Sequence, residues 1–207
     1  MKKSYSNFIE VGIDEAGRGP LMGRVYVGAV IWDDKLSSDL INDSKKLSKK
    51  KRKIAREWIE ENALDWAVGW ADAEEIDQIN ILQATRLAIT RCLESLTIKP
   101  KHIIIDGKFW KPFYLNGKRI YHRSIIKGDS QYYSIAAASI LAKEYHDDYI
   151  KELCEENPEL DRKYDWSNNM GYGTKKHLQG IERYGITQYH RKSYKPICNY
   201  VENSYII

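Results

Sequence analysis

The sequence predicts an α/β fold: a mixed β-sheet flanked by helices, with a small C-terminal helical lobe. Segments typical of strands come early in the chain, segments with helical spacing of apolar residues cluster late, and two of the predicted strands end in an aspartate. The chain has 207 residues, enough for one domain or one domain with a small appendage. A chain of this length can bury a core without disulfides or a structural metal.

Three strands are predicted near the N-terminus. Residues 8–13 alternate weakly and end at Asp14, and residues 24–32 (RVYVGAVIW) are rich in β-forming side chains. The glycine-rich residues 17–23 link these two segments as a turn. Residues 66–70 alternate Trp, Val and Trp with small residues, which indicates a third strand.

A buried strand and a hairpin are predicted in the middle of the chain. Residues 102–106 (HIIID) form a short apolar run that again ends in an acid. Residues 111–124 contain Asn116-Gly117 between apolar and aromatic side chains. This dipeptide is the signal of a β-hairpin with a type I′ turn.

Helices are predicted in three longer segments. Ser48 is a good N-cap for a helix that runs to Asn62. Apolar residues recur at helical spacing over residues 80–96, and residues 130–156 are strongly helical. The centre of the last segment, IAAASILA, has small residues that permit close packing on a sheet.

The C-terminal lobe is predicted to be short and partly irregular. Thr174 opens a short helix, for which Gly185 is the residue just past the end. The tail after Gly185 has no regular pattern, and the chain contains no internal repeat.

Basic residues are unevenly distributed. The formal net charge is only +4, from 33 Lys and Arg against 29 Asp and Glu. Three blocks are nonetheless rich in Lys and Arg and poor in acids, at residues 43–56, 101–127 and 171–199. If the fold gathers them on one face they form a track for phosphates; otherwise they are ordinary solvated surfaces. Tyr and Trp interleave with the second and third blocks, which favours nucleic acid as the ligand.

The cysteines and the N-terminus predict a cytoplasmic protein. Cys92, Cys154 and Cys198 lie far apart, with no CxxC pair and no zinc spacing, so we expect three reduced thiols. The N-terminus has no apolar segment typical of a signal peptide, and no run of about 18 apolar residues exists.

Three aspartates are candidates for one site. Asp14 and Asp106 end predicted strands, and ligands in open α/β sheets bind beyond strand ends. Asp129 opens the long predicted helix. If the three carboxylates converge, a cation must neutralise them, and an all-oxygen ligand set suits Mg²⁺ or Mn²⁺. Glu15 can join them only if the strand ends or bends after Asp14, because successive strand residues point to opposite faces.

Each acid also has a purely structural interpretation. Asp129 is equally compatible with a helix N-cap, Asp106 with the start of an Asp-Gly turn, and Asp14-Glu15 with an exposed loop.

Several common catalytic motifs are absent. The glycines at 17–23 read GxGxxxG rather than GxGxxG, and the chain has no P-loop, no GxSxG and no HExxH. Acids among basic blocks indicate metal-dependent phosphodiester hydrolysis. The alternatives are a non-catalytic duplex-binding module, a different nuclease on a related scaffold, and a glycosidase that uses Asp14 and Asp106.

The motifs resemble the type 2 ribonuclease H family, specifically ribonuclease HII. The start of the first strand within ten residues of Met1 favours HII over HIII, which typically has an extra N-terminal domain. The matching segments appear in the family's order: GIDEAGRGPLMG at 12–23, NDSKKLS at 42–48, IIIDG at 103–107, IIKGDSQYYSIAAASILAKEYHDD at 125–148 and GYGTKKHLQGIERYGITQYHRKSY at 171–194.

This resemblance implies a ribonuclease H-like catalytic domain over residues 1–165 and a C-terminal helical extension over residues 166–207. It implies an endonuclease that cleaves the RNA strand of RNA/DNA hybrids and nicks duplex DNA 5′ of embedded ribonucleotides. The products would carry 3′-hydroxyl and 5′-phosphate ends. Two Mg²⁺ or Mn²⁺ ions would act in catalysis, about 3.5–4 Å apart. The enzyme is expected to be a monomer with no membrane partner.

The resemblance also implies the site residues. The metal-binding acids of the family fall on Asp14, Glu15, Asp106 and Asp129. The substrate-binding positions fall on Gly17, Arg18 and Gly19, which would sense the ribose 2′-hydroxyl, on Tyr172, which would sense the RNA–DNA junction, and on Lys45 and Lys46, near phosphates. Asp147 and Asp148 are predicted to be salt-bridging or surface acids, and His177 and His190 are as compatible with a structural role as with phosphate contact.

Overall fold

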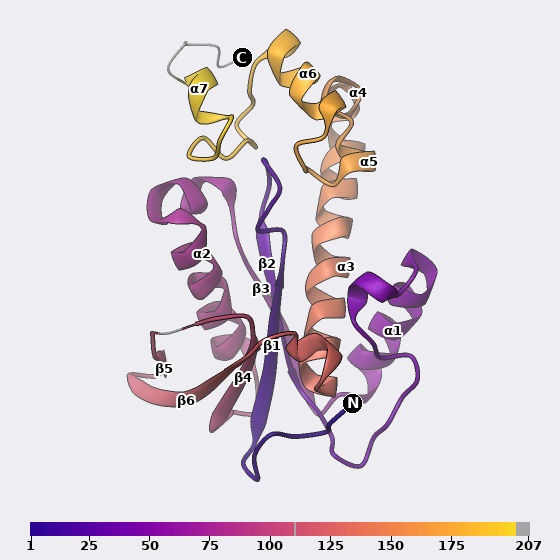
Figure 1. Cartoon of the computed structure of the whole chain (residues 1–207), viewed down its shortest axis with the longest axis vertical. Helices are drawn as coiled ribbons and strands as arrows, with labels where there is room; N and C mark the ends of the chain where they lie inside the picture. The colour runs from indigo at the N-terminus through magenta and orange to yellow at the C-terminus, as the bar shows by residue number, and fades with distance from the viewer. Residues whose placement is uncertain (110, 202–207) are drawn as a thin grey trace. The chain divides into compact units, whose positions relative to one another are not determined.

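The computed structural model describes residues 1–109 and 111–201, apart from the side chain of Lys45. Its centre is a six-stranded sheet with the order β3-β2-β1-β4-β6-β5 (Figure 1). Strand β1 is antiparallel to β2 and parallel to β4, which is in turn parallel to β6. The strands are β1 (Glu10–Ala16), β2 (Val25–Ile31), β3 (Asp65–Ala71), β4 (His102–Asp106), β5 (Phe113–Leu115) and β6 (Lys118–Ile125).

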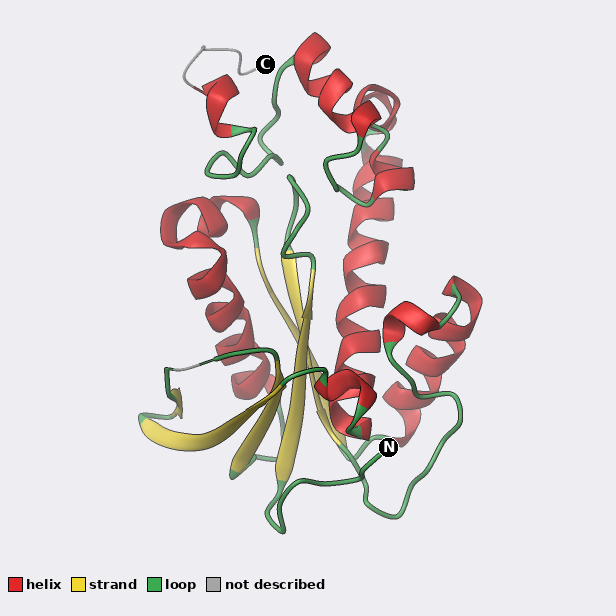
Figure 2. Cartoon of the chain, in the orientation of Figure 1, coloured by secondary structure: helices red, strands yellow, loops and turns green. Residues whose placement is uncertain are grey.

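Helices lie on both faces of this sheet (Figure 2). The helices are α1 (Lys49–Asn62), α2 (Ala73–Ser95), α3 (Tyr133–Glu156), α4 (Pro158–Tyr164), α5 (Trp166–Asn169), α6 (Lys175–Tyr184) and α7 (Cys198–Val201), with short 3-10 turns η1 (Ser44–Lys46) and η2 (Gly128–Ser130). The predicted mixed sheet with flanking helices is confirmed. No helix in the described part of the chain is long and apolar enough to cross a membrane.

The chain divides into two compact units. The first contains residues 1–16, 26–70 and 85–145, and the second contains residues 17–25, 71–84 and the described residues from 146 onwards. The second unit therefore combines the glycine-rich turn with the C-terminal region. The functional boundary after residue 165 stays a prediction.

Two hydrophobic layers hold the first unit together. On one face of the sheet, Val11 and Ile13 of β1 pack with Ile89 and Leu93 of α2. On the other face, the alanines at the start of α3 pack with α1 and with Val30. Adjacent strand residues point to opposite faces, so the alternation of β1 determines which side chains meet α2 and which meet α3.

Helix α3 packs unusually close to the sheet. A Cβ atom on Gly28 would collide with the main chain of Ala138, and one on Gly12 would collide with Ser134. Only glycine fits at these two strand positions, and the small residues of α3 allow the approach. The prediction that IAAASILA packs tightly on a sheet is therefore confirmed.

The predicted hairpin and helix caps are also confirmed. Asn116 and Gly117 both have positive φ angles (51° and 72°), as a type I′ turn requires. The Ser48 hydroxyl accepts a hydrogen bond from the Lys51 N–H, and Thr174 caps α6 in the same way.

Some boundaries differ from the predicted ones. Strand β1 does not end at Asp14 but continues to Ala16, because its pairing with β2 runs on to Tyr26. Helix α2 begins at Ala73, seven residues earlier than predicted, and is kinked at Asn80 (φ 66°). The Asn80 side chain accepts hydrogen bonds from the N–H groups of the next turn, so it caps the second half of the helix. Helices α4, α5 and α7 were not predicted from the sequence pattern.

Candidate active site

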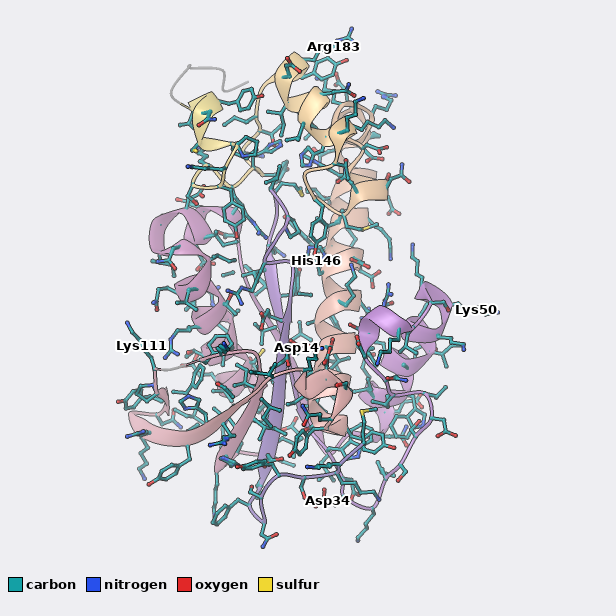
Figure 3. The ribbon with its side chains drawn as sticks, in the orientation of Figure 1. Asp14, Asp34, Lys50, Lys111, His146 and Arg183 are labelled. Atoms are coloured by element: carbon teal, nitrogen blue, oxygen red, sulfur yellow. The ribbon has the colours of Figure 1, made fainter. Side chains whose placement is uncertain are left out.

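Two of the candidate acids lie side by side on neighbouring strands. Ile13 of β1 pairs with Ile105 of β4, so Asp14 and Asp106 are the next residues in the same register. Parallel strands lie about 4.8 Å apart and register partners share a face. The alternation along each strand places both carboxylates on the face of the sheet that α3 covers, where Figure 3 shows Asp14.

Asp14 is held by hydrogen bonds in a buried position. Its side chain is 7% exposed, its Oδ1 accepts the Glu15 N–H at 2.8 Å, and it accepts a hydrogen bond from Ser139 of α3. Burial, with the nearby carboxylates of Glu15 and Asp106, nevertheless raises the pKa of Asp14 well above its ordinary value. The hydrogen bonds oppose this increase and do not overcome it. The position thus disfavours a negative charge unless a cation is bound nearby.

Glu15 starts on the opposite face from Asp14. Regular pairing continues through Glu15, whose partner is Val27, and Val27 belongs to the core on the α2 side. We expected Glu15 to join Asp14 only if the strand ends or bends after Asp14, and the strand does not end there. Glu15 is partly buried, and its charge still acts on Asp14.

Asp129 lies in a turn that is attached to Asp106. The turn η2 follows β6, and its Gly128 N–H donates to Asp106 Oδ1 at 2.7 Å. Asp129 is the next residue and is 6% exposed. It lies four residues before α3 begins at Tyr133, so it is not the N-cap of that helix.

The acids do not form a ready-made metal cluster. Within residues 1–109 and 111–201, no group of three or more His, Cys, Asp or Glu side chains is arranged to hold a metal ion. The structure provides the adjacent pair Asp14 and Asp106, and it places Asp129 next to a residue that contacts Asp106. All candidate ligands are carboxylate oxygens, which is the donor chemistry of Mg²⁺ and Mn²⁺.

The glycine-rich turn, residues 17–25, is built around one buried arginine. The Arg191 side chain is fully buried and donates to five main-chain carbonyl groups of the turn. Its Nη2 donates to Gly17 O (2.6 Å) and Arg24 O (3.1 Å), its Nη1 to Arg18 O (3.1 Å) and Pro20 O (2.8 Å), and its Nε to Gly23 O (3.0 Å).

This contact determines where the N–H groups of the turn point. In a trans peptide the N–H points opposite to the C=O. The carbonyls of Gly17 and Arg18 face Arg191, so the N–H groups of Arg18 and Gly19 point away from it. Gly17 has a φ of 84°, and a Cβ there would collide with the ring of His146, so the turn needs glycine at this position.

Tyr172 lies against the same turn. A Cβ on Gly19 would be 3.1 Å from the Tyr172 ring, and Tyr172 is 45% exposed. The Tyr172 carbonyl accepts hydrogen bonds from Thr174 N–H and from His177 Nδ1. The predicted ribose-sensing glycines and the predicted junction-sensing tyrosine are therefore neighbours within the second unit.

His177 and His190 form a buried network below Tyr172. Trp166 Nε1–H donates to His177 Nε2 at 3.0 Å, and the two histidine Nε2 atoms are 3.1 Å apart. Thr187 N–H donates to His190 Nδ1, which leaves the proton of His190 on Nε2 to be donated to His177. Burial lowers the pKa of both histidines, that of His190 to about 3. Both side chains are at most 1% exposed, and His177 Nδ1 donates to the Tyr172 carbonyl, so the pair supports the main chain at Tyr172.

The remaining candidates have varied positions. Lys46 is exposed, and its Nζ lies 3.9 Å from Asp43 Oδ2. The side chain of Lys45 lies outside the described part of the chain. Asp148 pairs with Lys151 at 2.6 Å, as predicted for a salt-bridging acid. Asp147 is buried rather than on the surface, beside His146 Nδ1 at 3.2 Å.

Some arginines of the first and third basic blocks form ion pairs or hydrogen bonds within the protein. Arg52 binds Glu144 of α3 at 2.8 Å, and Arg56 binds Glu60 at 2.7 Å, so both arginines support α1. Arg191 of the third block is the buried centre of the glycine-rich turn. Lys50 of the first block and Lys111 of the second lie on opposite sides of Asp14 in Figure 3.

Comparisons with known proteins give the family. The family model described as Ribonuclease HII matches residues 11–197, which is most of the chain. The chain belongs to the ribonuclease HII family. The ribonuclease HII of Bacteroides thetaiotaomicron is 50% identical over 188 residues, covering 91% of this chain and 90% of that protein. That of Christiangramia forsetii is 46% identical over 196 residues, covering 94% and 95%.

Solved structures show the same fold. The ribonuclease H2 of Pyrococcus horikoshii matches with a TM-score of 0.75 at 23% identity, covering 94% of this chain and 97% of that one. The RNase HII of Archaeoglobus fulgidus, solved in complex with PCNA, matches with a TM-score of 0.68 at 25% identity, covering 90% and 95%. The family makes the chain a ribonuclease H, a hydrolase that acts on RNA/DNA hybrids, and the fold expected from the sequence motifs is confirmed.

Sequence reasoning missed two structural supports of this site. From the sequence, Arg191 was only one charge of the third basic block, although it lies in HRKSY, the end of the family-like segment at residues 171–194. Ser139, which binds Asp14, stood out only as part of a small-residue helix segment.

Proposed function

We propose that this ribonuclease HII family member cleaves the RNA strand of RNA/DNA hybrids and nicks duplex DNA on the 5′ side of an embedded ribonucleotide. The products carry 3′-hydroxyl and 5′-phosphate ends. The observation that carries the proposal is the in-register pair Asp14 and Asp106, in which burial and the nearby carboxylates of Glu15 and Asp106 raise the pKa of Asp14.

Divalent ions complete the site in this proposal. Asp14 and Asp106 would hold Mg²⁺ or Mn²⁺, with Asp129 and Glu15 as the further carboxylate ligands. A relative, Bst-RNase HIII, has been solved in complex with Mn²⁺. When bound, two such ions activate a water and stabilise the leaving 3′-oxygen. No covalent bond between enzyme and substrate is needed.

The protein's own groups hold and orient the ions and the substrate. Ser139 and the Glu15 N–H fix the Asp14 carboxylate, and the Gly128 N–H fixes that of Asp106. The N–H groups of Arg18 and Gly19 recognise the ribose 2′-hydroxyl, which distinguishes RNA from DNA.

Three other groups contact the substrate beyond the ribose. Tyr172 packs its ring on the next sugar, where deoxyribose fits better than ribose. Lys45 and Lys46 contact phosphates. We further propose that the enzyme is a cytoplasmic monomer, with residues 1–165 as the catalytic region and residues 166–207 as the substrate-contacting extension.

The decisive experiment uses a duplex that carries one ribonucleotide, with an RNA/DNA hybrid and an all-DNA duplex alongside. Wild type should cut the first two in Mg²⁺ or Mn²⁺ and leave the third intact, and the ends should be extendable by a polymerase. Asp14→Asn should lower the cleavage rate by about 10²–10³-fold, because it removes a charge that holds the ions. The exposed Asp34, in the loop after β2, provides the matched control Asp34→Asn (Figure 3).

Metal binding is measured separately from turnover. In the absence of substrate, Mn²⁺ should raise the Tm of wild type and of Asp34→Asn but not that of Asp14→Asn. Wild-type cleavage by Asp14→Asn would contradict the assignment. Binding of hybrid without turnover in millimolar Mg²⁺ or Mn²⁺ would show a binding module instead.

A further inference from the structure

The second basic block, residues 101–127, presents its positive charges to solvent. All seven of its Lys and Arg side chains are exposed, and most lie on or beside β5 and β6. Neither Arg119 nor Arg123 forms an ion pair with a carboxylate of the described residues. The only acid in the block is Asp106. These charges are therefore available to an external ligand.

Strand register places two of these arginines on the same face of the sheet as the candidate acids. Asp106 pairs with Ile125 of β6, and Ile104 pairs with Arg123. Register partners in a sheet share a face, and every second residue of a strand returns to it. Arg123 and Arg119 therefore follow Asp106 along one face, on the strand next to β4.

This part of the face is open. Tyr121, between the two arginines, is 74% exposed, and Tyr114, the partner of Arg119 on β5, is 55% exposed. The Arg119 guanidinium is 6.0 Å from the centre of the Tyr121 ring. In Figure 1 the β5–β6 hairpin lies on the side of the sheet away from α1, and the exposure of Tyr114 and Tyr121 shows that no described helix covers this face of the hairpin.

The open face ends in a basic hollow. This hollow has a volume of about 820 Å³ and is lined by Phe8, Tyr121 and four cations, which are Lys99, Lys101, Lys118 and Arg119. Exposed aromatic rings among exposed cations are the surface that nucleic acids bind, because phosphates meet the charges and sugars or bases stack on the rings.

We infer that Arg123, Tyr121, Arg119 and Tyr114 form a stripe, here called the β6 stripe, that binds one arm of the substrate duplex. This inference rests on the proposed function, since it extends the path of the duplex away from Asp14 and Asp106. The charge of the stripe is complementary to a polyanion, and the stripe is continuous with the acids through strand register.

The stripe has a defined length. Arg123 is two residues and Arg119 six residues from Ile125, the partner of Asp106. At about 3.3 Å per residue, they lie about 7 and 20 Å along the strand. A duplex rises about 3.4 Å per base pair, so the stripe spans about six base pairs on one side of the cleaved bond.

The first test is the salt dependence of binding. The affinity of wild type and of the double variant Arg119→Gln, Arg123→Gln for a labelled duplex with one ribonucleotide is measured by fluorescence anisotropy from 0.05 to 0.3 M NaCl. Each lost phosphate contact should reduce the slope of log affinity against log salt by about 0.9, and weaken binding about fivefold at 0.15 M salt. The double variant should therefore bind about 25-fold more weakly.

Two controls isolate the role of the charge at this place. Arg119→Lys, Arg123→Lys keeps the charges and should keep most of the slope. Lys35→Gln removes an exposed charge from the loop after β2, at the opposite end of the strands from Asp14, and should bind as wild type does.

The second test varies the duplex. One arm at a time is shortened from ten to three base pairs on either side of the ribonucleotide. Wild-type affinity should fall once one particular arm is shorter than about six base pairs, and the Gln double variant should lose this dependence.

The outcomes separate this inference from the proposed function. If the double variant shows the same salt dependence of affinity and the same dependence on arm length as wild type, the β6 stripe does not bind the duplex. The exposed surface would then be a candidate for binding a protein. If wild-type enzyme does not cut the duplex at the ribonucleotide, the proposed function fails, whatever the arginine variants do.

Discussion

Asp14 is a buried carboxylate whose surroundings disfavour its own negative charge. A carboxylate with two hydrogen-bond donors would ordinarily have a lowered pKa, yet burial and the neighbouring acids raise that of Asp14. An arrangement that disfavours its own charge is costly for folding alone, and such groups cluster at functional sites. The sequence could predict Asp14 and Asp106 as a pair, because both follow short apolar runs that become neighbouring strands.

Other residues of the site were not predictable from sequence pattern. Fifteen tyrosines are present, and nothing in spacing or composition separates Tyr172 from the rest. Its position against Gly19 depends on a tertiary hydrogen bond, from the Leu21 N–H to the Gly171 carbonyl. Only the resemblance to known ribonucleases pointed to this residue.

The role of Tyr172 is testable by comparing two substrates. Tyr172→Ala should reduce cleavage at a single embedded ribonucleotide by about tenfold or more, because stacking on a nucleic acid is worth about 1–3 kcal/mol. Tyr172→Phe keeps the ring and should cleave at a rate close to that of wild type. Rates are measured on the single-ribonucleotide duplex and on a long hybrid. An unchanged rate for Tyr172→Ala on the former would show that the ring does not sense the junction.

At the scale of elements, the fit of β2 against α3 sets the position of Asp14. Asp14 pairs with Gly28, which has no room for a side chain below Ala138. The β-forming side chains of β2 and the small residues of α3 were visible in the sequence. The requirement for glycine at residue 28 was not, because it depends on how closely two distant segments approach.

Gly28→Ala should therefore disturb both stability and catalysis. The added methyl group meets main-chain atoms, which cannot move aside cheaply, so we expect a loss of about 1–3 kcal/mol in the free energy of unfolding. Gly117→Ala is the control: its Cβ would enter open space, and the cost comes only from the positive φ of 72°, about 1 kcal/mol. Urea unfolding compares the two variants. Equal stability would show that α3 can shift freely on the sheet.

A second element, the glycine-rich turn, depends on Arg191. Arg191→Lys keeps a positive charge but has only three donors on one nitrogen, and cannot reach the carbonyls that the guanidinium binds together. If the turn positions the N–H groups of Arg18 and Gly19, cleavage at an embedded ribonucleotide should fall by about 10²-fold, since small misplacements at a reacting centre cost this much.

The control for this variant separates positioning from stability. Rates are measured well below the Tm of each variant, and Arg183→Lys, on the exposed part of α6, serves as the matched substitution. A purely structural Arg191 would give a lower Tm with a wild-type rate, and that result would contradict the positioning role.

At the scale of the whole molecule, the sequence predicted the sheet and its main helices, but it did not predict which segments form each of the two compact units. The turn at Asn116-Gly117 and the helix caps Ser48 and Thr174 depend on contacts within a few residues, so the sequence predicts them correctly. The compact second unit instead collects residues 17–25, 71–84 and the C-terminal region, which are distant in sequence. Its interior combines an apolar cluster, which includes Met22, Trp166 and Ile181, with the buried polar side chains of Arg191, His177 and His190, each at most 1% exposed. Sequence patterns based on apolar periodicity do not detect the polar part of such a core.

The buried histidines predict how the stability of the whole chain responds to pH. In the folded protein His190 has a pKa of about 3, whereas the ordinary value is 6.5, so between these values the unfolded chain binds a proton that the folded chain does not. The free energy of unfolding should therefore fall as the pH is lowered below 6.5, by about 1.4 kcal/mol per pH unit for one such histidine. His177, whose pKa is also lowered by burial, acts in the same direction. Above pH 6.5 this contribution is complete and constant.

The measurement is urea unfolding at pH 7, 6 and 5 for wild type and His190→Gln. The glutamine amide can still donate to His177 but does not titrate, so the variant should lose part of the pH dependence between pH 6 and 5. Acids elsewhere contribute equally to both proteins, so the difference between their slopes isolates His190. Parallel slopes would mean that His190 accepts a proton within the folded core, which the hydrogen bonds from Thr187 N–H and to His177 leave no room for.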